Sequence, residues 1–272
     1  MLRPASRALL LGAALCALAP LAQGEGLSAE IKNENNRGKV EVQGSAAQFP
    51  DGTELRVEVV VKGNYPDPIV AALFRVRVQD GQFLQEETRP AVFAPLSYVV
   101  TLKLPVDAQA PQIRKLIEQK FGWPRNHVEK LDFVDVTLGT EEESAAFRLS
   151  VLRRLRTLNE ELEQVVECLA PATERPVAEN PAWKEQQAAF VGKARALGAK
   201  VRRFSREYAA LPDQDLLETL SKSLHKLSDI AAHVEKGGDP VVAQRDLGYV
   251  RGWTTGIEAD VTGRLPVEER ER

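Results

Sequence analysis

The sequence predicts an α+β protein made of two parts, an antiparallel β-sandwich with one short crossover helix and an antiparallel four-helix bundle that follows it. Between residues 39 and 139, apolar residues recur at every second position, which is the spacing of half-buried strands. After residue 139 they recur at every third and fourth position, as in amphipathic helices. We therefore expect a sandwich domain over residues 25–139, a bundle domain over 140–265 and a flexible charged tail over 266–272.

Four segments carry the strand signal. Apolar and polar residues alternate over 55–61, 74–79, 100–104 and 134–138, and Val60 is the exception within the first segment. One apolar face and one wetted face is the pattern of a strand that packs on one side of a sandwich. Several short strands at this spacing favour a sandwich or a barrel.

Two turn signals separate these segments. Pro50-Asp51-Gly52 and Asp80-Gly81 contain residues that tolerate a positive φ, so we expect hairpin turns there. The segments 49–57, FPDGTELRV, and 98–102, YVVTL, resemble those of immunoglobulin-like or transthyretin-like sandwiches in exported bacterial proteins. The resemblance implies a fold and a setting outside the cytoplasm. It carries over no active site, because such sandwiches host unrelated functions.

One segment of the sandwich region breaks the alternation. Residues 109–121 have apolar side chains at helical spacing, and Gly122-Trp123-Pro124 follows as a stop signal. We expect a short helix that crosses between two strands and covers one open end of the sheet.

Four apolar stripes predict the helices of the bundle, and each stripe must be buried against other helices. The stripes run over residues 151–169, 183–211, 217–234 and 242–261. The stripe over 183–211 is long enough to recruit a helix of a second chain as in a coiled coil. On the buried face of the last helix we place Val242, Asp246, Tyr249, Trp253, Ile257 and Val261.

Capping residues mark where these helices begin. Thr140 with Glu143 three residues later forms a capping box. Asn180, Asp213 and Asp239 each stand near a predicted helix start, and two of them precede a proline at the first helical position. The boundaries therefore predict four helices with mostly short connections.

The first 24 residues have the pattern of a secretory signal peptide. Arg3 and Arg7 form a positive region, residues 8–18 form a short apolar core, and small residues precede a cleavage site before Glu25. A membrane anchor is the alternative, but the apolar run is shorter than the ~20 residues that a bilayer requires. We expect the mature protein to be exported, periplasmic or secreted, with no transmembrane segment.

Charge and cysteine content narrow the classes of function. The chain has 36 basic and 39 acidic residues, and neither half has the net positive charge of a nucleic-acid binder. Of the two cysteines, only Cys168 follows the signal peptide. An intramolecular disulfide is therefore excluded in the mature chain, and Cys168 is either buried and unreactive or paired between chains.

The strongest pattern for a metal site is His225, Asp229 and His233 on the third predicted helix of the bundle. Residues four apart face the same way, so either neighbouring pair could share a metal ion, but all three could not. The competing interpretation, which we favour, is a solvated polar strip beside the apolar stripe. We therefore predict neither a metal nor a cofactor.

A run of basic residues on the second predicted helix of the bundle is the candidate interaction surface. It could meet anionic lipid headgroups or an anionic cell-envelope polymer. The favoured alternative is a solvated face that pairs with Glu160, Glu161, Glu163 and Glu167 on the preceding helix. The basic residues are Lys193, Arg195, Lys200, Arg202, Arg203 and Arg206.

No catalytic motif accompanies these features, and histidine and cysteine are scarce. We therefore expect a non-catalytic interaction or scaffold protein of the bacterial cell envelope, with a protein partner or self-association. A small-ligand or metal carrier, with a pocket in the bundle or at the domain junction, is the second hypothesis. A hydrolase with a composite carboxylate site is the third.

Overall fold

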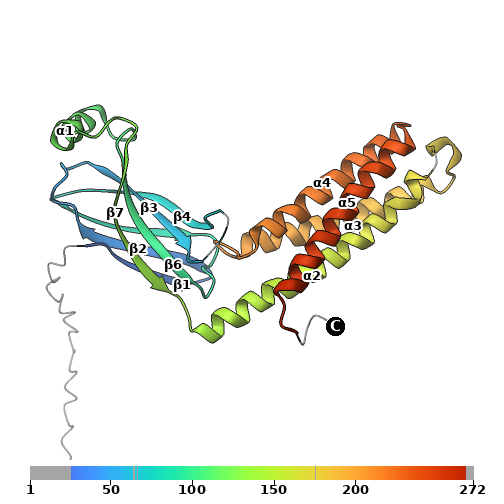
Figure 1. The fold of residues 1–272 in the computed structure, drawn as a ribbon, viewed down its shortest axis with the longest axis horizontal. Coiled ribbons are helices and arrows are strands. Elements are labelled where there is room, and N and C mark those ends of the chain that lie inside the picture. Colours follow the sequence, from blue (N-terminus) through green and yellow to red (C-terminus); the bar gives the residue numbers. More distant parts are fainter. Residues whose placement is uncertain (1–25, 64, 66, 175, 268–272) are drawn as a thin grey trace, which may run out of the picture.

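The computed structural model describes residues 26–267 except 64, 66 and 175, so the predicted signal peptide lies outside the described residues. The described residues form seven strands, five α-helices and two short 3-10 turns, which confirms a mixed α+β fold (Figure 1). In chain order the elements are β1 (Ser28–Glu34), β2 (Arg37–Ser45), β3 (Glu54–Val61), β4 (Val70–Arg77), β5 (Gln82–Arg89), β6 (Ser97–Pro105), α1 (Pro111–Phe121), β7 (Val128–Thr137), α2 (Glu141–Leu169), α3 (Trp183–Glu207), α4 (Gln214–Glu235) and α5 (Pro240–Arg264).

The strands form two antiparallel sheets, in the orders β1-β2-β5 and β4-β3-β6-β7, and neither closes into a barrel within the described residues. The alternation read from the sequence is present in three dimensions. Along β3, the side chains of Leu55, Val57, Val59 and Val61 are buried, and those between them are half-buried. This pattern is the one expected of a strand with one face against the core.

The two predicted hairpin turns behave differently. Asp80 and Gly81 both have a positive φ, and Gln79 bridges Gln82 across them, as in a tight two-residue turn. The strands on either side, β4 and β5, then diverge into different sheets. Gly52 also has a positive φ, but its turn connects β2 and β3, which belong to different sheets. The hairpin prediction is therefore wrong for Gly52, because the chain crosses between the sheets there.

Helix α1 is the predicted crossover helix, and it connects β6 to β7. It lies at the end of the sheets away from the long helices (Figure 1). Ile117 is fully buried against the strands, and the Phe49 ring lies 5.3 Å from the ring of Phe121 at the end of α1. The helix therefore covers one end of the apolar space between the sheets.

The four long helices extend to one side of the sheets and pack on one another (Figure 1). Helix α2 packs against α3, α4 and α5, and α4 packs against both α3 and α5. The capping box of α2 is confirmed, since the Thr140 hydroxyl accepts from the Glu143 amide and the Glu143 carboxylate accepts from the Thr140 amide. Asp239 caps α5 through the amide of Val241.

Two other caps are not formed. Asp213 has a left-handed φ of 62° and makes no capping hydrogen bond, although it precedes α4. Asn180 accepts from the amide of Ala182, but α3 begins only at Trp183. Asp213 stands at the predicted helix start, but its carboxylate accepts from the Arg264 guanidinium instead of the helix amides. Asn180 satisfies a backbone donor of the turn before α3, so it does not cap the helix itself.

The buried face of α5 also differs from the prediction. Tyr249 and Trp253 are 57% and 39% exposed, whereas Leu247, Val250 and Thr254 are buried. Ile257 and Val261 are buried as predicted. The buried residues follow steps of three and four that include alanine and threonine as well as large apolar residues. The face predicted over residues 242–253 is therefore rotated by roughly a quarter turn, because the assignment followed the two aromatic residues.

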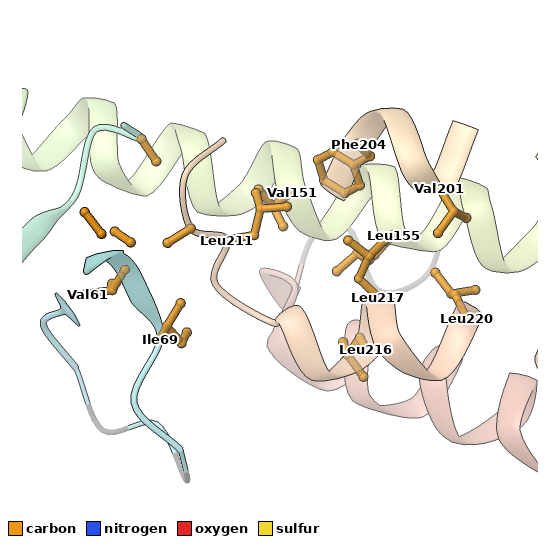
Figure 2. Close-up of a cluster of buried hydrophobic side chains, with 14 of the residues drawn as sticks. Val61, Ile69, Val151, Leu155, Val201, Phe204, Leu211, Leu216, Leu217 and Leu220 are labelled. Atoms are coloured by element: carbon orange, nitrogen blue, oxygen red, sulfur yellow. The ribbon is translucent and has the colours of Figure 1, made fainter. Parts of the chain in front are cut away.

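The sheets and the helices meet through the segment that follows α3. The amide of Ala209 donates to the carbonyl of Val92 at 2.8 Å, and Tyr208 bridges Val92. Figure 2 shows Leu211 between Val61 and Ile69 of the sheet region and Val151 of α2. The apolar stripe predicted over residues 183–211 therefore continues in space to Leu211, although the helix itself ends at Glu207.

Candidate binding groove

A groove of about 510 Å³ lies between α3 and α4. Consecutive helices joined by a short segment run antiparallel, so the C-terminal half of α3 lies beside the N-terminal half of α4. The groove is lined on α3 by Gln187, Phe190, Val191, Ala194, Arg195, Gly198, Val201 and Arg202, and on α4 by Ser221, Leu224, His225, Ser228, Ala231, Ala232 and Glu235.

Small side chains create the space between these two helices. Ala194 and Gly198 lie one turn apart on α3, and α4 contributes the small residues Ser228, Ala231 and Ala232 to the lining. A Cβ added at Gly198 would meet only the Arg202 guanidinium, at 3.4 Å. The space beside Gly198 is therefore open rather than filled by a neighbouring backbone.

The floor of the groove is apolar. Phe190 is 3% exposed and Val201 is 5% exposed, so both belong to the core beneath the groove. Ala194 and Leu224 are half-buried and present methyl groups above them. An apolar floor of this kind favours a ligand that also buries an apolar surface.

The walls of the groove are polar and exposed. Arg195 and Arg202 stand on the α3 wall, and Ser228 and His225 stand on the α4 wall. Glu235 lies at the end farther from the sheets. An apolar floor between polar walls, with two arginines on one side, could accommodate an occupant that combines an apolar surface with negative charge.

The structure resolves how the predicted basic run is placed. Lys200 binds the Glu161 carboxylate of α2 at 2.5 Å. Two other glutamates of the proposed pairing have different partners, since Glu160 pairs with Arg156 and Glu167 with Arg251. Within the described residues, no carboxylate forms an ion pair with the remaining five basic residues, which are Lys193, Arg195, Arg202, Arg203 and Arg206.

The three candidate metal ligands are not brought together around one point. The His225 ring is 4.0 Å from the Asp229 carboxylate, and both side chains are mostly exposed. The His233 ring instead lies 3.3 Å from the carbonyl of Asp239. Across the described residues, no group of three or more histidine, cysteine, aspartate or glutamate side chains could hold a metal ion. His225 lines the groove.

Outside the groove, the clearest polar cluster joins α4 to α5. Lys226 binds the carboxylate of Asp246 at 2.6 Å, and this bond is the main reason that the pKa of Asp246 is lowered. Arg245 adds a second contact at 3.3 Å. These groups contribute to the packing of the helices.

Cys168 is half-buried and forms no disulfide.

Sequence reasoning found the cations of the groove but missed the groove itself. It placed Arg195 and Arg202 in the basic run, and it grouped His225 with a metal site. The available signal was the series of small residues beside the apolar stripes, such as Ala194 and Gly198. Small residues occur both where two helices pack closely and where they leave space, so this signal does not by itself locate a groove.

No protein-family model, curated protein or solved structure matches this chain. Among the helices of the described residues, none has the length and apolar character needed to cross a membrane.

Proposed function

We propose that this protein is an exported, non-catalytic interaction or scaffold protein of the bacterial cell envelope, and that it binds a protein partner in the groove between α3 and α4. The observation that carries the proposal is an open apolar floor bordered by exposed polar walls. Export rests on the signal-peptide pattern of residues 1–24.

The dimensions of the groove suit a macromolecular partner. It runs along α3 from Gln187 to Arg202, which corresponds to roughly 22 Å of helix. Small-molecule sites bury most of the ligand surface. Here the wall residues Arg195 and Ser228 are exposed, and an occupant would keep one side in solvent unless it belonged to a larger molecule.

The proposed architecture gives each part a role. Helices α2 to α5 would form an antiparallel four-helix bundle domain, and the pairwise packing of these helices supports this. The strands would form an immunoglobulin-like or transthyretin-like sandwich domain that holds the bundle at a fixed angle through Leu211 and Val92. In this arrangement the sandwich domain would hold the groove in position, and the groove would bind the protein partner.

Two glycine substitutions on α3 test the proposal with a matched control. Gly198→Leu places a side chain in the groove, whereas Gly192→Leu places the same side chain outside it, where an added Cβ has no neighbour within 4 Å. Leucine favours a helix over glycine by about 0.8 kcal/mol, so both variants should be slightly more stable than the parent. Only Gly198→Leu should lose the partner.

The measurement is native mass spectrometry of the mature protein purified from its own cell envelope, in the parent and both variants. We expect a mass above that of the bare chain for the parent and for Gly192→Leu, and the bare chain for Gly198→Leu. Equal partner retention by Gly198→Leu and Gly192→Leu would contradict the groove as the binding site. A small-molecule adduct in place of a protein would instead support the carrier function.

A further inference from the structure

We infer that the partner segment bound in the α3–α4 groove is an acidic amphipathic helix, an inference that rests on the proposed function. The groove offers an apolar floor for the nonpolar stripe of such a helix and a cationic wall for its acidic flank. Docking of an amphipathic helix into an apolar groove is a common mode of recognition between proteins.

The positive charge of the α3 wall favours a partner segment with negative charge. Arg195 and Arg202 are seven residues apart on α3, so they lie about two turns apart on the same side of the helix. Within the described residues, neither forms an ion pair. An occupant that covered them without supplying carboxylates would desolvate two guanidinium groups at a cost. Carboxylates spaced two turns apart on the partner helix would match both.

The floor of the groove selects a helix over an extended segment. Ala194, Gly198 and Ala231 have short side chains, which allows another backbone to approach closely. Packed helices lie about 8–10 Å apart, and large residues of one fit between small residues of the other. Leucine side chains at positions i, i+4 and i+7 of the partner would enter these spaces.

A lipid surface or an anionic polymer is the competing source of negative charge, and the structure distinguishes it. Arg203 is exposed on α3 and lies outside the groove, as does Arg206. A flat membrane or a flexible polymer would contact such outward cations at least as strongly as those on the wall. A helix seated in the groove would depend on Arg202 and not on Arg203.

The test uses two labelled helical peptides of about 18 residues that share one leucine stripe and differ in their flanks, glutamate in one and lysine in the other. Fluorescence anisotropy titrations measure their binding to the mature protein and to the variants Arg202→Glu and Arg203→Glu. We expect the glutamate peptide to bind the parent roughly tenfold more tightly than the lysine peptide. Arg202→Glu should remove most of that preference, and Arg203→Glu should leave it within about twofold of the parent.

Equal binding of the two peptides, or an equal effect of Arg202→Glu and Arg203→Glu, would overturn the inference. Cosedimentation with phosphatidylglycerol-containing vesicles is run in parallel. The inference would also be overturned if the protein bound these vesicles but not the peptides, and if Arg203→Glu and Arg202→Glu weakened vesicle binding equally. That result would mean that the basic residues bind a membrane surface. Failure here is separable from failure of the proposed function, because Gly198→Leu tests occupancy of the groove regardless of the partner's charge. Thermal unfolding of both arginine variants shows that they remain folded.

Discussion

Asn159 provides a test of how the helices are packed, because it is a polar residue at a buried position of α2. Its side chain is 1% exposed, and its Nδ2 donates to the carbonyl of Thr254 in α5 at 3.0 Å. Its Oδ1 is buried, and no donor among the described residues reaches it. A buried polar atom without a partner destabilises the folded state.

We predict that Asn159→Leu stabilises the protein by about 1–2 kcal/mol. Leucine has the same number and branching of heavy atoms as asparagine, so the substitution creates neither a cavity nor a longer side chain, although the two methyl groups are somewhat bulkier than the amide. Removal of the buried Oδ1 recovers roughly 1–3 kcal/mol of desolvation cost, and loss of the bond to Thr254 costs about 1 kcal/mol. Burial of additional carbon adds to the gain.

Urea denaturation followed by circular dichroism measures the effect as an increase in the midpoint with an unchanged slope. Asn159→Asp is the control, and it should be less stable than the parent by several kcal/mol near neutral pH, because it would bury a charge. A midpoint for Asn159→Leu below that of the parent would refute the reasoning, since the single hydrogen bond would then outweigh the unpaired oxygen.

Two further predictions concern the sheets and their junction with the helices. Tyr98 is fully buried, its hydroxyl donates to the carbonyl of Ala94 at 2.8 Å, and burial raises the pKa of its phenol well above the usual range. The unfolded chain therefore ionises first, so the parent loses stability as pH rises above about 10, by at most ~1.4 kcal/mol per pH unit for this group. Tyr98→Phe should be less stable than the parent by about 1 kcal/mol at pH 8, and urea titrations should show that this difference shrinks at pH 11. A difference that stays constant would contradict the raised pKa of the Tyr98 phenol. Leu211→Ala should lower the free energy of unfolding by roughly 2–5 kcal/mol in the same assay, because Leu211 is 4% exposed and lies between the sheets and α2. A loss under about 0.5 kcal/mol would contradict the packing of this junction.

Local patterns predicted the elements well and their assembly poorly. The capping box at Thr140 and the alternation from Leu55 to Val61 depend on near neighbours, and both are present in the structure. The buried face of α5 depends on which helices pack against it, and the aromatic rings of Tyr249 and Trp253 misled the assignment.

The groove could not be predicted for a related reason. It depends on the spacing of α3 and α4, which the sequence determines only through many contacts between elements. Ala194 and Gly198 would look the same in a tightly packed pair of helices as in a pair that leaves space. The basic residues were visible, but whether they were paired with glutamates depended on the positions of α2 and α5, as the bonds of Glu160 and Glu167 show.

Site-specific photo-crosslinking in cells that express the protein tests most directly whether the groove is the binding site. A photoreactive phenylalanine analogue replaces Val191, which lines the groove and is 41% exposed, or Ala199, which is exposed on α3 outside it. The account predicts a discrete protein adduct from position 191 that Gly198→Leu removes, and none of the same mass from position 199. Adducts of equal yield at both positions, or an adduct at 191 that persists with Gly198→Leu, would contradict it.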